Sequence, residues 1–361
     1  MPLLGTGRVP PKQKTNDPSR LGFVDDTRGI AVVLMILWHT ADSWIAPALK
    51  VGRAYDALRS LGGLAAPMFL MLAGAGAVLK IAGDAERGKA RGQTLLELSC
   101  RGLEVVVAGY ALRVFMWVFD AGALSNLGLL PAYGPLAVGL ALMYAALGRL
   151  SSRKPRALRI LLVGVAIWAV GWWQVSVIKP EMLVRVGRVD VLQAIGMSIV
   201  LLAGTEPLVG YAKRPYAGLV LGLVLASVTG LLEAVLPGPL HPCLAGYIAR
   251  WEDGVGPTVS RFPLFPWLGY AACGTTIGMV WLRGVRAGRT QAAVLGLALV
   301  GTVVGVLAHE STPWAFAFVE RFPELSRTLR MLQKIGFGLT LSGVSFLLTQ
   351  RLERYPLRTL G

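Results

Sequence analysis

An arginine, a histidine and an aspartate occur at helical spacing within the first apolar segment of the chain. Arg28 opens a run of apolar residues that leads to His39, and Asp42 follows three residues later. At the helical rise of 1.5 Å per residue, Arg28 and His39 are about 16 Å apart along the axis, and the three side chains share one face. Ionisable groups in an apolar segment are costly and usually face a protein interior or a water-filled cavity. The segment therefore predicts chemistry as well as a membrane span.

His39 and Asp42 have the residue types and the spacing of a base and its orienting partner. A neutral imidazole accepts a proton from an attacking hydroxyl or amine, and a carboxylate fixes its tautomer and stabilises the imidazolium. We therefore predict His39 and Asp42 as catalytic residues. The alternative is structural, with His39 bound to a neighbouring helix and Asp42 solvated at the membrane surface. Arg28 binds the phosphates of a cytosolic donor, or instead reaches lipid headgroups or pairs with Asp25.

Four further residues are predicted to line a pocket for the molecule that is modified. They are Arg113, Asp190, Gln193 and Trp267. Arg113 lies inside an apolar segment, where it either binds an anionic or sugar substrate or pairs with Asp120 or Asp42. Asp190 also suits a helix cap, and Trp267 suits either a sugar platform or the aromatic belt of a membrane interface.

The remaining histidines and the cysteines give weaker indications. His241 and His309 are each either a second base or an ordinary loop residue. Cys100, Cys243 and Cys273 have no metal-binding or disulfide-framework spacing, so the sequence predicts no metal site.

The composition of the chain is that of a membrane protein. Hydrophobic residues make up 54% and charged residues 16% of the 361-residue chain, against about 45–50% and 25% in soluble domains. The apolar residues form runs long enough to cross a bilayer and show no strand alternation. The prediction is an all-α fold, a polytopic transmembrane helical bundle of about ten spans. The spans are roughly 28–46, 61–82, 97–119, 131–150, 157–178, 189–204, 215–236, 264–282, 291–308 and 331–350.

The distribution of lysine and arginine between the loops predicts the orientation of this bundle in the membrane. With the N-terminus inside, the inner loops hold about twice as many of them as the outer loops, so both termini are predicted to be cytoplasmic. The predicted organisation is a disordered tail over 1–19, a single transmembrane domain over 20–350 and a basic tail over 351–361. The basic residues behind the net charge of +16 lie in short loops between spans, as the positive-inside rule expects, so we predict no nucleic-acid partner. The expected location is the inner, cytoplasmic membrane of the cell, in a multi-pass arrangement with Arg28 inside and His39 in the outer half.

Four short blocks resemble a known enzyme family. They are Arg20–Ala31 with the run to His39, Ala65–Gly74, Val191–Gly196 and Pro263–Gly269. In this order they resemble the catalytic domain of heparan-α-glucosaminide N-acetyltransferases and their bacterial relatives. The heparan enzymes have asparagine where this chain has His39, and their catalytic histidine follows in the next segment. Thr40 to Leu64 contains none. A broader similarity to surface-polysaccharide O-acetylases, with a histidine late in an Arg-containing first helix, implies that either His39 takes over the role of the base or the chemistry differs from that of the heparan enzymes.

The resemblance implies a transmembrane acyltransferase. It would move an acetyl group from cytosolic acetyl-CoA, bound near Arg28, to a hydroxyl or amine of a sugar or glycan at the outer face, with no metal. The implied partners are acyl-CoA, the acceptor and the lipid bilayer, and the oligomeric state is open. Two other classes remain: a transporter or flippase of a lipid-linked sugar or small anion, for which the same buried charges line a pathway, and a scaffold without catalysis.

Overall fold

The structure is a computed structural model that describes residues 22–118, 130–152, 154–178, 188–235, 247–248, 262–319 and 323–351. The described residues in regular secondary structure are all helical. The predicted terminal tails lie outside this part of the chain, except residue 351, and so do Asp120, His241 and Cys243.

Ten long helices correspond to the ten predicted spans, which confirms the all-α prediction. They are α1 (Gly22–Trp44), α3 (Ala65–Glu86), α4 (Arg91–Val118), α5 (Leu130–Ser151), α6 (Pro155–Ile178), α8 (Val191–Val209), α9 (Ala217–Val235), α11 (Leu264–Arg286), α12 (Thr290–Val319) and α13 (Pro323–Arg351). A 3-10 turn, η1 (Pro47–Leu49), and the short helix α2 (Arg53–Gly62) connect α1 to α3.

Among the described residues, six helical segments are long and apolar enough to cross a membrane. They are Arg53–Glu86, Tyr133–Ser151, Arg156–Val177, Val191–Val209, Thr290–Ser311 and Arg327–Gln350. The other long helices are α1, α4, α9 and α11. α1 and α4 carry several charges, and the segment Ala217–Thr229 of α9 is a shorter apolar helix. Most of α11 is buried, so its glycines and threonines contact protein, where low hydropathy costs less than in lipid. The chain is thus a multi-pass helical membrane protein.

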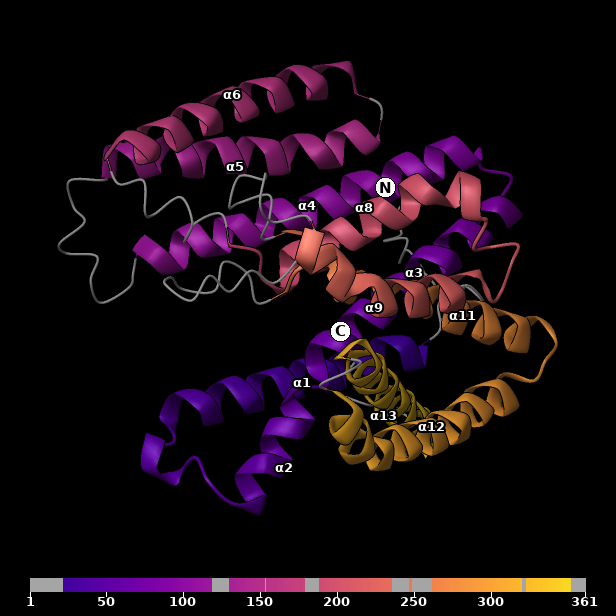
Figure 1. Ribbon diagram of the computed structural model, residues 1–361. Coiled ribbons are helices and arrows are strands. Elements are labelled where there is room, and N and C mark those ends of the chain that lie inside the picture. The colour runs from indigo at the N-terminus through magenta and orange to yellow at the C-terminus, as the bar shows by residue number, and fades with distance from the viewer. Residues whose placement is uncertain are drawn as a thin grey trace, which may run out of the picture.

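The centre of the bundle is the pair of helices α3 and α11. α3 contacts α1, α4, α8, α11 and α13, and α11 also contacts α8, α9 and α12. α5 and α6 form a hairpin that packs mainly on α4, at the edge of the bundle opposite to α1 and α2 (Figure 1). Five helices therefore bring residues from distant parts of the sequence around α3.

Close helix contacts depend on glycine at the centre. A Cβ atom on Gly74 would lie 1.8 Å from the carbonyl oxygen of Ala271, and one on Gly274 would lie 2.1 Å from that of Met71. Small residues let membrane helices approach until their backbones touch, which compensates for the missing hydrophobic driving force in lipid. α3 and α11 therefore have little freedom to slide against each other.

The two ends of the bundle carry different residues. At one end, called the His39 end, α1 finishes and α3, α8, α11 and α13 begin. At the other, the Asp84 end, α3 finishes and α4 begins. Arg286 of α11 pairs with Glu86 of α3, and Thr349 of α13 donates a hydrogen bond to Asp26 of α1. These contacts place the last turns of α11 and α13 at the Asp84 end.

Candidate functional site

His39 and Asp42 lie on the last turns of α1, and both side chains are exposed. The Asp42 carboxylate accepts hydrogen bonds from Lys50 Nζ at 3.1 Å and from the Tyr55 hydroxyl at 3.4 Å. The rings of Tyr55 and Trp38 are 6.0 Å apart. In the described part of the chain, no hydrogen bond joins Asp42 to His39. Asp42 thus connects α1 to the segment that leads into α3, and it does not hydrogen-bond the imidazole of His39 within the part of the chain that the structure describes.

Arg113, Asp190 and Gln193 form one cluster between α4 and α8. Arg113 Nη2 lies 3.2 Å from Asp190 Oδ2, so Arg113 pairs with a carboxylate other than the two expected, of which Asp120 lies outside the described residues. Asp190 also caps α8, and its backbone N–H donates a hydrogen bond to Oε1 of Gln193, as in a capping box. Gln193 is fully buried, whereas the side chain of Asp190 is 44% exposed. The carboxylate of Asp190 is therefore the part of this cluster most accessible to a second molecule.

Trp267 belongs to an aromatic group at the start of α11. Its ring centre lies 4.7 Å from that of Phe262 and 5.4 Å from that of Tyr270. Lys334 of α13 places its Nζ atom 5.7 Å from the centre of the Trp267 ring. An aromatic surface is therefore combined with a positive charge.

The structure brings six of the predicted residues to one end of the bundle. The residues at the His39 end are His39, Asp42, Arg113, Asp190, Gln193 and Trp267. α4 runs from Arg91 at the Asp84 end, where it contacts Glu206 of α8, to Arg113, where it contacts Asp190. Antiparallel packing of α4 and α8 is what puts residues 77 positions apart in contact.

Arg28 lies on the other half of α1. Its guanidinium donates a hydrogen bond to Asp25 at 2.7 Å, and its side chain remains 34% exposed. A Cβ atom on Gly76 would lie 3.3 Å from Arg28 Nη2, so the guanidinium passes close to α3. The pair with Asp25 is the structural alternative proposed for this residue, and the remaining exposure leaves room for an anion.

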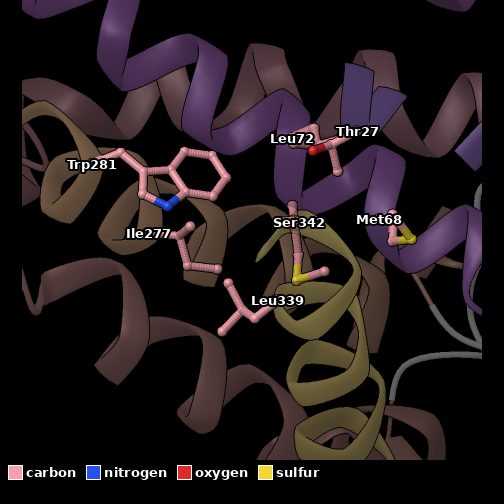
Figure 2. Close-up of a pocket in the computed structure, with 8 residues that line it drawn as sticks. Thr27, Met68, Leu72, Ile277, Trp281, Leu339 and Ser342 are labelled. Carbon is pink, nitrogen blue, oxygen red and sulfur yellow. The ribbon is translucent and has the colours of Figure 1, made fainter. Parts of the chain in front are cut away.

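A small cavity lies next to Arg28 where α1, α3, α11 and α13 meet. Its volume is about 10 Å³, close to the space that one water molecule needs. Figure 2 shows Trp281 and Ile277 of α11, Leu339 of α13 and Leu72 of α3 around it. Met68 and Met71 complete the wall, together with Thr27 and Ser342. The lining of this cavity is mostly apolar, and we call it the apolar seam.

A larger cavity of about 410 Å³ opens at the Asp84 end. It is lined by Ile81, Ala82, Ala85, Glu86, Lys89, Arg91, Thr94, Glu206, Ala212, Lys213 and Arg286. Most of its cations are paired: Lys89 with Glu97 at 2.6 Å, Arg91 with Glu206 at 3.0 Å, and Arg286 with Glu86.

Arg28 does not line this larger cavity. Gly76, beside Arg28, and Ala85, in the cavity wall, are nine residues apart and face opposite sides of α3, because a helix turns about 100° per residue. The cavity is also about 30 Å from the His39 end along α3.

Burial raises the pKa of Tyr211, which follows α8 next to the cavity, so its phenol stays protonated and forms a hydrogen bond of 2.9 Å with Thr205.

Sequence reasoning missed Tyr55 and Lys50 as partners of Asp42, and it missed Lys334. Lys334 had a signal, because it is a lysine within an apolar helix. Tyr55 and Lys50 had none, because only the turn after α1 brings them back to Asp42. The described residues contain no cluster of three or more potential metal ligands, and the described cysteines, Cys100 and Cys273, are free and buried.

The fold and the site define the class of protein. It is a helical, multi-pass membrane protein with a histidine at one end of the bundle and cationic groups at the other. The family described as heparan-alpha-glucosaminide N-acetyltransferase, catalytic, matches residues 20–131 and 136–313. The chain belongs to this family, which confirms the resemblance found in the sequence. Neither a curated protein nor a solved structure matched the chain.

Proposed function

We propose that this protein is an integral-membrane acyltransferase. It transfers an acetyl group from cytosolic acyl-CoA to a hydroxyl or amine of a sugar or glycan at the outer face of the membrane. The observation that carries the proposal is the placement of Arg28 and His39. Both lie within the family match, on one helix, in halves that belong to opposite ends of the bundle. A donor end and an acceptor end on one helix suit a reaction that crosses the membrane.

His39 acts as the base in this proposal. Its exposed imidazole accepts the proton of the acceptor hydroxyl or amine as that group attacks. The Asp42 carboxylate, one turn further along the helix, favours the imidazolium through its charge, while Lys50 and Tyr55 hold the carboxylate in place. Arg113 and Asp190 are proposed to contact the acceptor from α4 and α8, with Gln193 supporting Asp190, and Trp267 is proposed as the sugar platform.

The donor fits the residues around Arg28. A half-buried guanidinium suits a phosphate, because it offers several donors in a planar fork. Thr27, the neighbouring residue, lines the apolar seam that runs on to Met68 at the His39 end. The donor supplies the thioester, and the seam would shield its arm from water. The same proposal places the protein in the inner membrane of the cell with both termini in the cytoplasm. The lysines and arginines at the Asp84 end support this orientation.

Arg28 and Lys213 provide a matched test of where the donor phosphates bind. We expect Arg28→Gln to raise the KM for acetyl-CoA by about tenfold, since a charged hydrogen bond contributes about 1.5–3 kcal/mol. Lys213→Gln removes a cation from the larger cavity, on the opposite face of α3, and should leave this KM unchanged. Steady-state kinetics on purified variants measures both values. A rise with Lys213→Gln alone would move the donor to the larger cavity.

The reaction itself is tested in sealed liposomes that contain the purified protein. Acetyl-CoA labelled in the acetyl group is supplied on one side and glucosamine on the other. We expect label in N- or O-acetylated sugar and free CoA on the donor side. Movement of sugar across the membrane without acetylation, and no dependence on acetyl-CoA, would instead identify a transporter.

A further inference from the structure

Lys334 is a charged residue within an apolar helix that the proposed reaction does not yet use. It lies inside the candidate span Arg327–Gln350 of α13, and its side chain is half-buried. In the described part of the chain, no carboxylate lies within ion-pair distance of it. The nearby charge is that of Arg330, a second cation one helical turn away. Like charges four residues apart on a helix repel each other. Arg330 therefore adds to the free energy needed to hold the charged side chain of Lys334 in an apolar helix.

Lys334 lies at the same end of α3 as His39. One turn further along α13, a Cβ atom on Gly338 would lie 2.5 Å from Met71 Cε and 3.3 Å from Met68 Cγ. Because α13 and α3 run in the same direction, Lys334 lies level with the start of α3. A Cβ atom on Gly62, just before that start, would lie 2.4 Å from Trp38, the residue next to His39. Lys334 and His39 therefore flank the same end of α3.

The immediate surroundings of Lys334 suit a sugar. The ammonium group lies over the ring of Trp267, which contacts the rings of Phe262 and Tyr270. Binding sites for small polar molecules combine apolar and aromatic walls with a few placed charges. A flat aromatic surface next to a cation offers one contact for a sugar ring and a second for a negative substituent. Neither contact requires the other residues of the proposed mechanism.

We propose that Lys334 and Trp267 form an acceptor subsite for an anionic sugar, one that carries a phosphate, sulfate or carboxylate group. This inference rests on the proposed function for its role, since it names the class of acceptor. The ammonium of Lys334 binds the anionic group, and the ring of Trp267 supports the sugar. Lys334 is thus a specificity-determining residue, which positions the acceptor near His39 and takes no part in proton transfer.

Equilibrium binding without a donor tests the subsite separately from catalysis. The full-length protein in detergent is titrated calorimetrically with glucosamine 6-phosphate and with glucosamine. We expect Lys334→Met to weaken binding of the phosphorylated sugar by about tenfold, equivalent to about 1.4 kcal/mol, and to leave glucosamine binding unchanged. Methionine keeps the length and the contact with Trp267. Lys334→Arg should retain most of the affinity, and Arg53→Met, which removes an exposed cation of α2, should have no effect.

The outcomes separate the subsite from the reaction. Three results would overturn the subsite. They are equal affinity of the unmodified protein for both sugars, no binding of either sugar, and an equal loss of affinity for both sugars in Lys334→Met. So would a Lys334→Met variant whose only defect is a lower Tm in nanodiscs containing anionic lipid, because that result assigns the charge to a lipid phosphate. Normal binding without any acetyl transfer would contradict the proposed function and leave the anionic-sugar subsite standing.

Discussion

His39→Ala is expected to lower acetyl transfer by about 10²–10⁴-fold, the range that a positioned general base contributes. His39 is exposed, and no hydrogen bond from it is present in the described part of the chain. Alanine should therefore remove the base without disturbing the helix. The loss should appear in kcat with little change in the KM for acetyl-CoA, because the predicted donor site lies around Arg28. Transfer of labelled acetyl groups by purified protein measures both constants.

His309→Ala is the matched control for this experiment. His309 is also exposed, and its Nδ1 atom lies 3.0 Å from Gln333 Nε2. Its replacement should leave kcat unchanged. Asp42→Asn should reduce kcat less than His39→Ala does, because the carboxylate is bound by Lys50 and Tyr55 and acts on the imidazole only through its charge. Full activity of His39→Ala would remove His39 from the mechanism and direct attention to the other two histidines.

Gly74→Val is expected to cause the largest loss of folded protein among single substitutions at helix contacts. The first added carbon would lie 1.8 Å from the carbonyl oxygen of Ala271, which is a backbone atom and cannot rotate away. Overpacking a tight interior costs about 1–3 kcal/mol and occasionally more. Here α3 and α11 would have to separate at the centre of the bundle. Thermal unfolding of the detergent-purified protein should show a Tm lowered by several degrees and a smaller monodisperse fraction.

Gly204→Ala on α8 provides the control for this substitution. A Cβ atom on Gly204 would meet no other atom within 4 Å, and alanine is the better helix former by about 1 kcal/mol. This variant should be at least as stable as the unmodified protein. A Gly74→Val variant with an unchanged Tm would mean that α3 and α11 do not approach as closely as their backbones do in this structure.

The long helices could be predicted from sequence because lipid leaves a span few alternatives. A backbone without water must bond within its own helix, so an apolar run of sufficient length already specifies the element. The helix boundaries were less certain, as α1 shows: the expected span began at residue 28, and the helix begins at Gly22. The charged first turns of α1 lack the apolar signal, but Phe23 packs on Trp281 and Phe346, and Thr349 donates a hydrogen bond to the buried Asp26.

The sequence alone determined which residues are costly in a membrane and the helix on which each one lies, since length and composition fix both. Arg28, His39 and Arg113 were visible in this way. Only the tertiary structure decided which of them meet. It paired Arg113 with Asp190, gave Asp42 to Lys50 and Tyr55, and put Lys334 over Trp267. It also placed Arg28 and the larger cavity on opposite faces of α3. The reason is that such contacts depend on how helices cross and which faces meet, and small residues such as Gly74 and Gly274 set that geometry.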